Sequence, residues 1–149
     1  ISVDEATAKD IIKQHITRLP AHDDVVPTLK ALQSAGVTLV ALSNSSKAGL
    51  DAQLEFANIK PYFSHVLSVE SVRTYKPHAA VYHWACQQAN VKNEDAMMVA
   101  AHGWDVSGAK ATGMQTAFVE RSGKMMYPLG LAPDHSIASL TALIEMISS

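Results

Sequence analysis

The sequence predicts an α/β domain built on a doubly wound parallel sheet. Short β-rich apolar runs alternate with helix-like patterns at intervals of ~25–30 residues, which is the spacing of β-α-β crossovers. Two of the runs, 37–42 and 95–101, are almost continuous in apolar residues, and such runs favour strands buried on both faces of a parallel sheet. No repeat, low-complexity tract or linker interrupts the alternation, so we expect one α/β core.

The expected elements follow from proline, glycine and cap signals along the chain. Pro20 ends the first helix, Pro77 precedes a later one, and Gly36 and Gly113 stand at helix C-terminal stops. The expected helices are 6–19, a segment from Asp23 through Leu32, 47–58, 79–90, 104–112 and a last helix capped by Ser136. The expected strands are 37–42, 65–69, 95–101 and 115–119, with 121–133 as a loop. The helix within 1–19 has no obvious sheet partner, so we place the core at 20–149.

Composition and charge exclude several classes of protein. A hydrophobic share of 48% over 149 residues is enough for a compact core. A net charge of -2 provides no basic surface for nucleic acid. The apolar runs are far shorter than the ~20 residues that a membrane helix needs, and residues 1–10 lack the apolar core of a signal peptide. The single cysteine, Cys86, is predicted to pack in a helix, which suits a reducing compartment. We therefore predict a cytoplasmic protein with no nucleic-acid or membrane partner.

Polar side chains follow two of the predicted strands. Ser43 and Asn44 come directly after the first strand, and His102 and Asp105 follow the strand ending at Ala101. In open parallel sheets this edge is where ligands bind. Hydroxyl, amide and helix N-terminal N–H groups could converge on an anion there, and a carboxylate could act as a general base. Each group could equally be an ordinary turn or helix cap.

Lys76 lies between Tyr75 and Pro77, on a connector whose backbone the proline restricts. A lysine held in this way could supply a fixed positive charge, although most surface lysines are simply solvated. Trp104 could form the wall of a pocket or pack in the core. The sequence contains no glycine-rich phosphate loop and no Cys/His metal-ligand cluster, so we predict neither a metal site nor a cofactor.

The order of these motifs is specific. A strand ends in Leu42-Ser43-Asn44, the triplet Tyr75-Lys76-Pro77 is followed by Tyr82, and a second strand ends in His102-Gly103-Trp104-Asp105. Over residues ~20 to 149 this order resembles the haloacid dehalogenase superfamily, most closely its type II, L-2-haloacid dehalogenases. The resemblance implies the Rossmann-like sheet of that superfamily, with residues 1–19 as the tail of a helical cap domain.

The resemblance also implies a reaction and roles for the residues. In this family an aspartate displaces halide from a small 2-haloacid, and water hydrolyses the resulting ester to a 2-hydroxy acid without a cofactor. Lys76 would keep the nucleophile ionised, and Asp105 would activate the water and pair with Lys76. Ser43 and Asn44 would bind the substrate carboxylate, and Tyr82 would lie in the pocket. Trp104 is assigned to substrate binding on the same ground, and a homodimer is expected.

Two departures from the family pattern stand out. Ala100 and His102 occupy positions where type II enzymes carry a serine and an asparagine, so His102 is expected to take over hydrogen bonding in the site. The family nucleophile, on an N-terminal strand, has no counterpart, since no early aspartate follows an apolar strand. The early aspartates without such a strand before them are Asp4, Asp10, Asp23 and Asp24.

From these departures we predict a sheet lacking its N-terminal central strand and most of the helical cap. The chain starts with Ile1 rather than Met, and we expect it to be a piece of a longer enzyme, inactive alone and marginally stable. Two alternatives stay open. A Mg²⁺-dependent phosphatase of the same superfamily would usually carry a second acid where this chain has Ala101. A non-catalytic binding or packing domain would also fit the missing nucleophile.

Overall fold

The protein has an α/β fold with parallel strands, as the sequence predicts. The computed structural model describes residues 4–147, apart from the side chains of residues 13 and 14. The helices in this part of the chain are α1 (Glu5–Ile16), α2 (Val25–Ser34), α3 (Lys47–Phe56), α4 (Ala79–Gln88), α5 (Gly103–Lys110) and α6 (Ala142–Ile147). The strands are β1 (Val40–Ser43), β2 (His65–Ser68), β3 (Met97–Ala100), β4 (Gln115–Val119) and β5 (His135–Ile137). Short 3₁₀ turns precede β2, follow it and precede β3.

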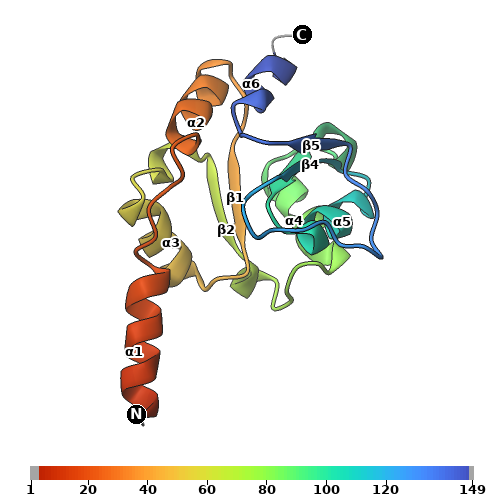
Figure 1. The fold of residues 1–149 in the computed structure, drawn as a ribbon. Coiled ribbons are helices and arrows are strands. Elements are labelled where there is room, and N and C mark those ends of the chain that lie inside the picture. Colours follow the sequence, from red (N-terminus) through yellow and green to blue (C-terminus); the bar gives the residue numbers. More distant parts are fainter. Residues whose placement is uncertain (1–3, 148–149) are drawn as a thin grey trace.

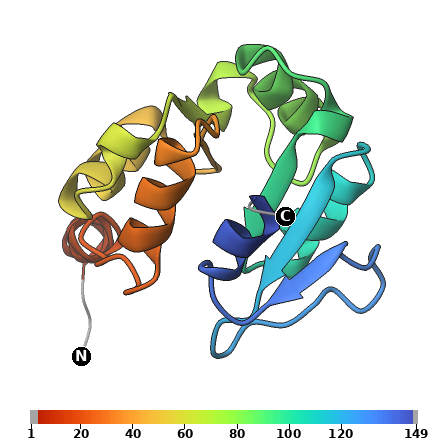
Figure 2. The same ribbon diagram turned by 90° about the horizontal axis from the view of Figure 1, so that it is seen from above.

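The strands form two separate parallel sheets (Figure 1). β1 pairs with β2 in one sheet, and the other has the order β3-β4-β5. Figure 2 shows the two sheets with their helices as two halves, which the chain joins through the segment between β2 and α4. This architecture confirms the predicted Rossmann-like sheet without its central strand.

β1 and β3 differ from β4 in burial because they have fewer strand partners. Every residue of β1 and β3 is only half-buried, whereas β4, paired on both sides, is buried from Thr116 to Val119. The expectation that the runs 37–42 and 95–101 would be buried on both faces is therefore wrong for this chain. Each run forms a strand that pairs on one side alone among the described residues, so its other edge keeps unpaired backbone groups.

Most elements are a few residues shorter than predicted, and two differences have a clear structural reason. β1 begins at Val40 rather than Val37, because its ladder with β2 starts at the Val40–His65 pair. Ser136 does not cap the last helix but lies in β5. A strand of three residues is too short to produce a recognisable apolar period, and tertiary pairing with β4 defines it instead.

The helix α1 stands away from the rest of the molecule (Figure 1). Its apolar residues Ile11, Ile12 and Ile16 are 47%, 61% and 52% exposed. A hydrogen bond from Gln53 Nε2 to the Ile16 carbonyl, at 3.1 Å, joins its end to α3. The assignment of residues 1–19 to the tail of a helical cap stays a prediction. Within the described residues, no helix combines the length and the apolarity needed to cross a bilayer.

Two buried clusters hold the elements together. The first includes Leu32 and Leu39 from the half that carries β1, and Ala117 and Leu143 from the half that carries β4, so one core joins both halves. The second packs α4 against α5 through Tyr82, Cys86, Ala109 and Met114. Cys86 is buried, which confirms its predicted packing role, and burial raises the pKa of its thiol.

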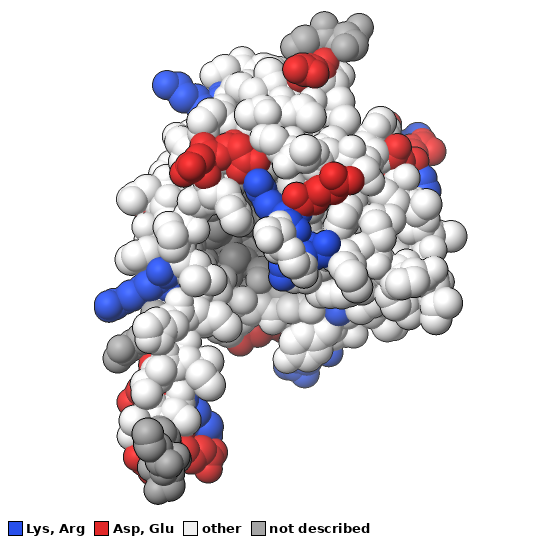
Figure 3. Space-filling view, in the orientation of Figure 1, with Lys and Arg blue, Asp and Glu red and all other residues white. Residues whose placement is uncertain are grey.

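An ion pair also connects the two halves. Asp24, just before α2, accepts hydrogen bonds from Arg121 Nη2 at 2.7 and 2.9 Å and from the Leu140 N–H at 2.8 Å. The hydrogen bonds from Arg121 are the main cause that lowers the pKa of Asp24 to about 2. On the face seen in Figure 3, acidic and basic side chains are interspersed rather than gathered by sign.

The substitution Asp24→Asn is expected to lower the free energy of unfolding by about 2 kcal/mol at pH 7. The folded-state pKa lies below the ordinary value, so the stabilisation is present above pH ~4 and is lost as the pH falls through about 2. Urea unfolding of both proteins at several pH values measures the difference. The matched control is Asp23→Asn at the exposed neighbouring position, and a difference that stays constant down to pH 2 would contradict the ionic explanation.

Candidate active site

The predicted site residues gather at the carboxyl ends of β1 and β3. Ser43 is the last residue of β1, and Asp105 lies in the first turn of α5, which follows β3. Lys76 lies on the connector before α4 and reaches between the two halves of the fold. Its Nζ donates to the Leu42 carbonyl of β1 at 3.1 Å and to Asp105 Oδ2 at 2.6 Å.

The Lys76–Asp105 pair is buried. The two side chains are 7% and 5% exposed. Taking two charges out of water is expensive, and the pair is tolerated only where further hydrogen bonds satisfy both groups. Lys76 donates a further hydrogen bond to the Leu42 carbonyl, and Asp105 accepts one from the Tyr82 hydroxyl.

Tyr82 holds the second oxygen of Asp105. The fully buried phenol lies 2.8 Å from Asp105 Oδ1 and 3.1 Å from the Asp105 backbone carbonyl, and donates to them. Burial and the charge of Asp105 raise the pKa of Tyr82 well above its ordinary value, so the hydroxyl keeps its proton and stays a donor. Each carboxylate oxygen of Asp105 therefore has its own donor, and its orientation is fixed.

Asn44 fixes the connector that carries Lys76. Its Oδ1 accepts from the Lys76 backbone N–H at 2.9 Å, and its Nδ2 donates to the Lys76 carbonyl at 3.2 Å. The side-chain amide is thus engaged with backbone at both ends. The neighbouring Ser43 Oγ accepts from the Ser45 N–H at 3.0 Å. Binding of a substrate carboxylate by Ser43 and Asn44 stays a prediction.

Trp104 and His102 lie at the outer side of the ion pair. The Trp104 ring is 37% exposed, and Lys76 Nζ lies 6.0 Å from its centroid, within the range of a cation–π contact. The ring centroids of Trp104 and His102 are 5.6 Å apart. The exposed His102 turns its ring to the loop after β4 rather than to Asp105. Its Nε2 lies 3.1 Å from Lys124 Nζ in the loop after β4.

Two glycines of α5 allow the surrounding segments to approach closely. A Cβ on Gly108 would lie 2.5 Å from Pro77 Cβ and 2.9 Å from the Tyr82 hydroxyl. A Cβ on Gly103 would lie 2.2 Å from the Tyr127 nitrogen. The small-residue pattern of this helix is visible in the sequence, but which partner it admits is not. The sequence pattern does not identify Gly108, which leaves room for the Tyr82 hydroxyl, or Lys124, which contacts His102.

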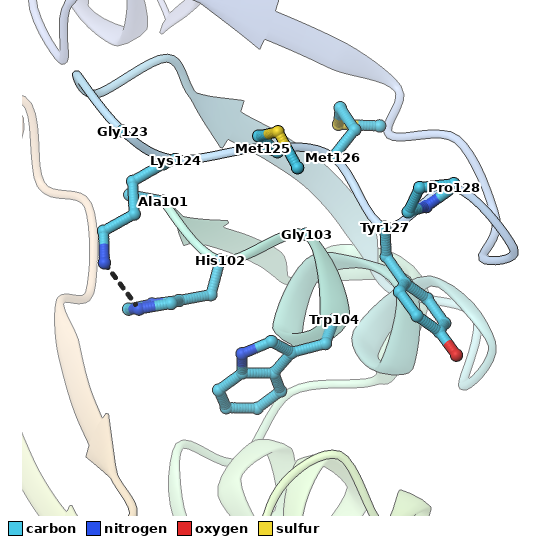
Figure 4. Close-up of a pocket in the computed structure, with 10 residues that line it drawn as sticks. All are labelled: Ala101, His102, Gly103, Trp104, Gly123, Lys124, Met125, Met126, Tyr127 and Pro128. Atoms are coloured by element: carbon cyan, nitrogen blue, oxygen red, sulfur yellow. Dashed lines mark hydrogen bonds between the residues drawn. The ribbon is translucent and has the colours of Figure 1, made fainter.

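A hollow of about 410 Å³ adjoins this site (Figure 4). Residues 101–104 of the β3–α5 turn and residues 123–128 of the loop after β4 line it. Figure 4 shows the His102 and Trp104 rings projecting on the same side of the turn, with Lys124 reaching across to His102. The described residues contain no group of three or more His, Cys, Asp or Glu side chains placed to hold a metal ion.

Parallel strands with interleaved helices, and a buried lysine–aspartate–tyrosine cluster at the carboxyl ends of β1 and β3, are the features of a Rossmann-like α/β fold with a candidate site. A family model described as haloacid dehalogenase-like hydrolase matches residues 3–119. The chain belongs to this family.

Relatives with assigned names share most of this chain. It is 31% identical over 148 residues to haloacetate dehalogenase H-2 of Moraxella sp. (strain B), covering 99% of this chain and 66% of that protein. It is 30% identical over 145 residues to an (S)-2-haloacid dehalogenase of Pseudomonas sp. (strain YL), covering 97% and 62%. The chain therefore spans just under two-thirds of the length of these relatives.

Solved structures agree with this assignment. The L-2-haloacid dehalogenase of Xanthobacter autotrophicus with chloropropionic acid covalently bound superposes with a TM-score of 0.92 at 26% identity, over 100% of this chain and 69% of that one. The L-2-haloacid dehalogenase RSc1362 superposes with a TM-score of 0.89 at 29% identity, over 100% and 65%.

Proposed function

We propose that the protein containing this chain hydrolyses L-2-haloacids to 2-hydroxy acids through an aspartyl ester. The observation that carries the proposal is the buried Lys76–Asp105–Tyr82 cluster at the carboxyl edge of the sheet. The names of the relatives, haloacetate and (S)-2-haloacid dehalogenases, support the substrate class of small halogenated carboxylic acids.

The first step needs a carboxylate nucleophile near Lys76. An aspartate oxygen attacks the carbon that bears the halogen, the carbon–halogen bond breaks, and halide leaves with the bonding electrons while the configuration inverts. The Lys76 ammonium offsets the negative charge brought to the site. Among the described residues, the carboxylate bonded to Lys76 is Asp105, which Tyr82 also holds. We therefore assign the nucleophile to a strand between β1 and β3, supplied from outside residues 1–149.

Two findings support that assignment. β1 and β3 each pair on one side alone in the described fold, and the relatives are longer than this chain. A strand in that position would end between Ser43 and Ala101, next to the Lys76 ammonium. On this proposal the chain alone is inactive, because it holds the half of the site that activates water but lacks the half that attacks the substrate.

The second step uses the residues present here. Water attacks the ester carbonyl and gives one proton to Asp105. The tetrahedral intermediate collapses, the alkoxide of the 2-hydroxy acid leaves with the remaining proton of the water, and the nucleophile carboxylate is restored. Asp105 then releases its proton to solvent. Asp105 is suited to accept this proton because Lys76 and Tyr82 hold its orientation. Ser43 and Asn44 are proposed to bind the substrate carboxylate, Trp104 to form part of the pocket wall, and His102 to contribute hydrogen bonding. A cytoplasmic location and a homodimer stay predictions.

The decisive experiment measures halide release by the full-length protein from L-2-chloropropionate and from its D enantiomer. Release from the L substrate alone, with an inverted 2-hydroxy acid as product and no loss of rate after treatment with a chelator, is expected. The 149-residue chain, assayed in parallel, is expected to release none. Dehalogenation by this chain alone would remove the need for an added strand.

A magnesium-dependent phosphatase is the second candidate. A HAD phosphatase from Thermococcus onnurineus shares the fold with a TM-score of 0.80 at 24% identity. Such a site uses oxygen ligands, and this chain places Ala101 where a second acid would be expected. Phosphate release that depends on added Mg²⁺, without halide release, would favour this candidate. If the full-length protein releases neither halide nor phosphate, the result would favour a non-catalytic domain.

A further inference from the structure

The contact between Lys124 and His102 joins the loop after β4 to the turn that carries Asp105. Lys124 Nζ lies 3.1 Å from His102 Nε2, as the dashed line in Figure 4 marks. The proposed reaction does not require this contact. It nevertheless bears on which nitrogen of the imidazole carries the proton.

The backbone around Lys124 is held in place. The Lys124 N–H donates to the Arg121 carbonyl at 2.9 Å, which closes a turn over residues 121–124. Gly123, the third residue of that turn, has φ +73°, a conformation that favours glycine. Arg121 is itself bonded to Asp24. The turn therefore presents Lys124 toward His102 from an anchored position.

The chemistry of the two groups restricts their protonation. An ammonium has donors and no acceptor, so a hydrogen bond from Lys124 requires a lone pair on His102 Nε2. A neutral imidazole with its proton on Nδ1 provides that lone pair. A protonated imidazole carries N–H groups at both positions, and would place two cations 3.1 Å apart.

The surrounding charges act on His102 from three segments. Partial burial of the imidazole, and then the charge of Lys124, lower the pKa of His102 below its ordinary value. Lys76, on the connector before α4, acts in the same direction. Asp105, on α5, acts in the opposite direction, since a cationic His102 would be attracted to its carboxylate. A protonated His102 would thus compete with Lys76 for the group that accepts the proton of water.

We propose that Lys124 is a positioning residue that holds His102 uncharged, with its proton on Nδ1, so that Asp105 keeps Lys76 as its cationic partner during ester hydrolysis. This inference rests on the proposed function for its catalytic consequence, but the state of His102 can be measured independently. Acidification is expected to protonate His102, break its contact with Lys124 and weaken the action of Asp105 on water.

Nuclear magnetic resonance of the ¹⁵N-labelled full-length protein measures the histidine tautomer and titration directly. The His102 signals are assigned by their loss in the variant H102N. We expect an Nδ1–H tautomer in the unmodified protein, and a titration midpoint that rises by about one pH unit in K124M. K124R, which keeps a cationic donor, is expected to keep the low midpoint. The matched control is K92M, where an exposed lysine remote from His102 is removed.

The rate profile supplies a second readout. In K124M the acid limb of kcat/KM is expected to move to higher pH by the same amount, with little change on the alkaline side, and K92M should leave the profile unchanged. An Nε2–H tautomer, or a His102 midpoint that is the same in K124M and K92M, would overturn the proposal. The titration does not depend on the substrate, so failure of the dehalogenase assay and failure of this inference are separate results.

Discussion

Replacing Lys76 by methionine is expected to lower the free energy of unfolding by about 3–5 kcal/mol and to abolish ester formation. The substitution leaves the Asp105 carboxylate buried with Tyr82 as its remaining side-chain donor, and an unpaired buried charge is strongly destabilising. Methionine has a volume near that of lysine, so packing is preserved while the charge is removed. Urea unfolding of the full-length protein at pH 7 measures the loss.

Two variants separate the charge effect from a general effect of lysine removal. K92M removes a lysine from an exposed pair with Glu94, where the side chains are 77% and 72% exposed, and is expected to change stability by less than about 0.5 kcal/mol. The double variant K76M/D105N removes both charges and is expected to recover about 2 kcal/mol relative to K76M. Equal stability of K76M and K92M would show that the buried pair does not matter to folding.

The placement of Ser43 and Asp105 at one edge could be predicted because it depends on chain order. Parallel strands bring their carboxyl ends to one edge of a sheet, so polar residues that directly follow apolar runs come together wherever those runs are strands. The ion pair between Lys76 and Asp105 was expected from the family resemblance, and the structure contains it at 2.6 Å.

The contacts of Asn44 could not be predicted in the same way. An amide after a strand can bind a ligand, cap a helix or hold backbone, and the sequence does not distinguish these roles. The fold decides, because the connector at Lys76 passes close enough to accept and donate at once. Lys124 could not be predicted for a related reason: its contact with His102 depends on a turn over residues 121–124 in which Gly123 adopts a positive φ.

The burial of β1 and β3 shows a different limit of prediction from the sequence. An apolar run reports what a strand packs against in the whole protein, so β1 and β3 carry the composition of doubly covered strands. In the described residues each is only half-buried, since each has a strand partner on one side. The mismatch between composition and burial points to the same gap between β1 and β3 to which the proposed function assigns the nucleophile.

The substitution Asp105→Asn is expected to lower steady-state dehalogenation by about 10³-fold, a loss typical of removing a general base. Asparagine keeps the shape of the side chain and can still accept hydrogen bonds, but it cannot take a proton from water. The first step does not use this proton transfer. The variant should therefore release about one equivalent of halide per protein molecule and then stop, with the ester retained.

Intact-mass measurement after mixing D105N with L-2-chloropropionate would detect the retained ester as one added propionate group. Y82F is a milder variant for comparison with D105N. It removes the hydroxyl that donates to Asp105 Oδ1 but leaves the carboxylate and Lys76 in place. Its steady-state loss is expected to be about tenfold, the effect of one hydrogen bond to a charged group. Continuous turnover by D105N, with no burst and no bound ester, would mean that another group activates the water. In that case Asp105 serves to hold Lys76, and K76M and D105N should then fail at the same step.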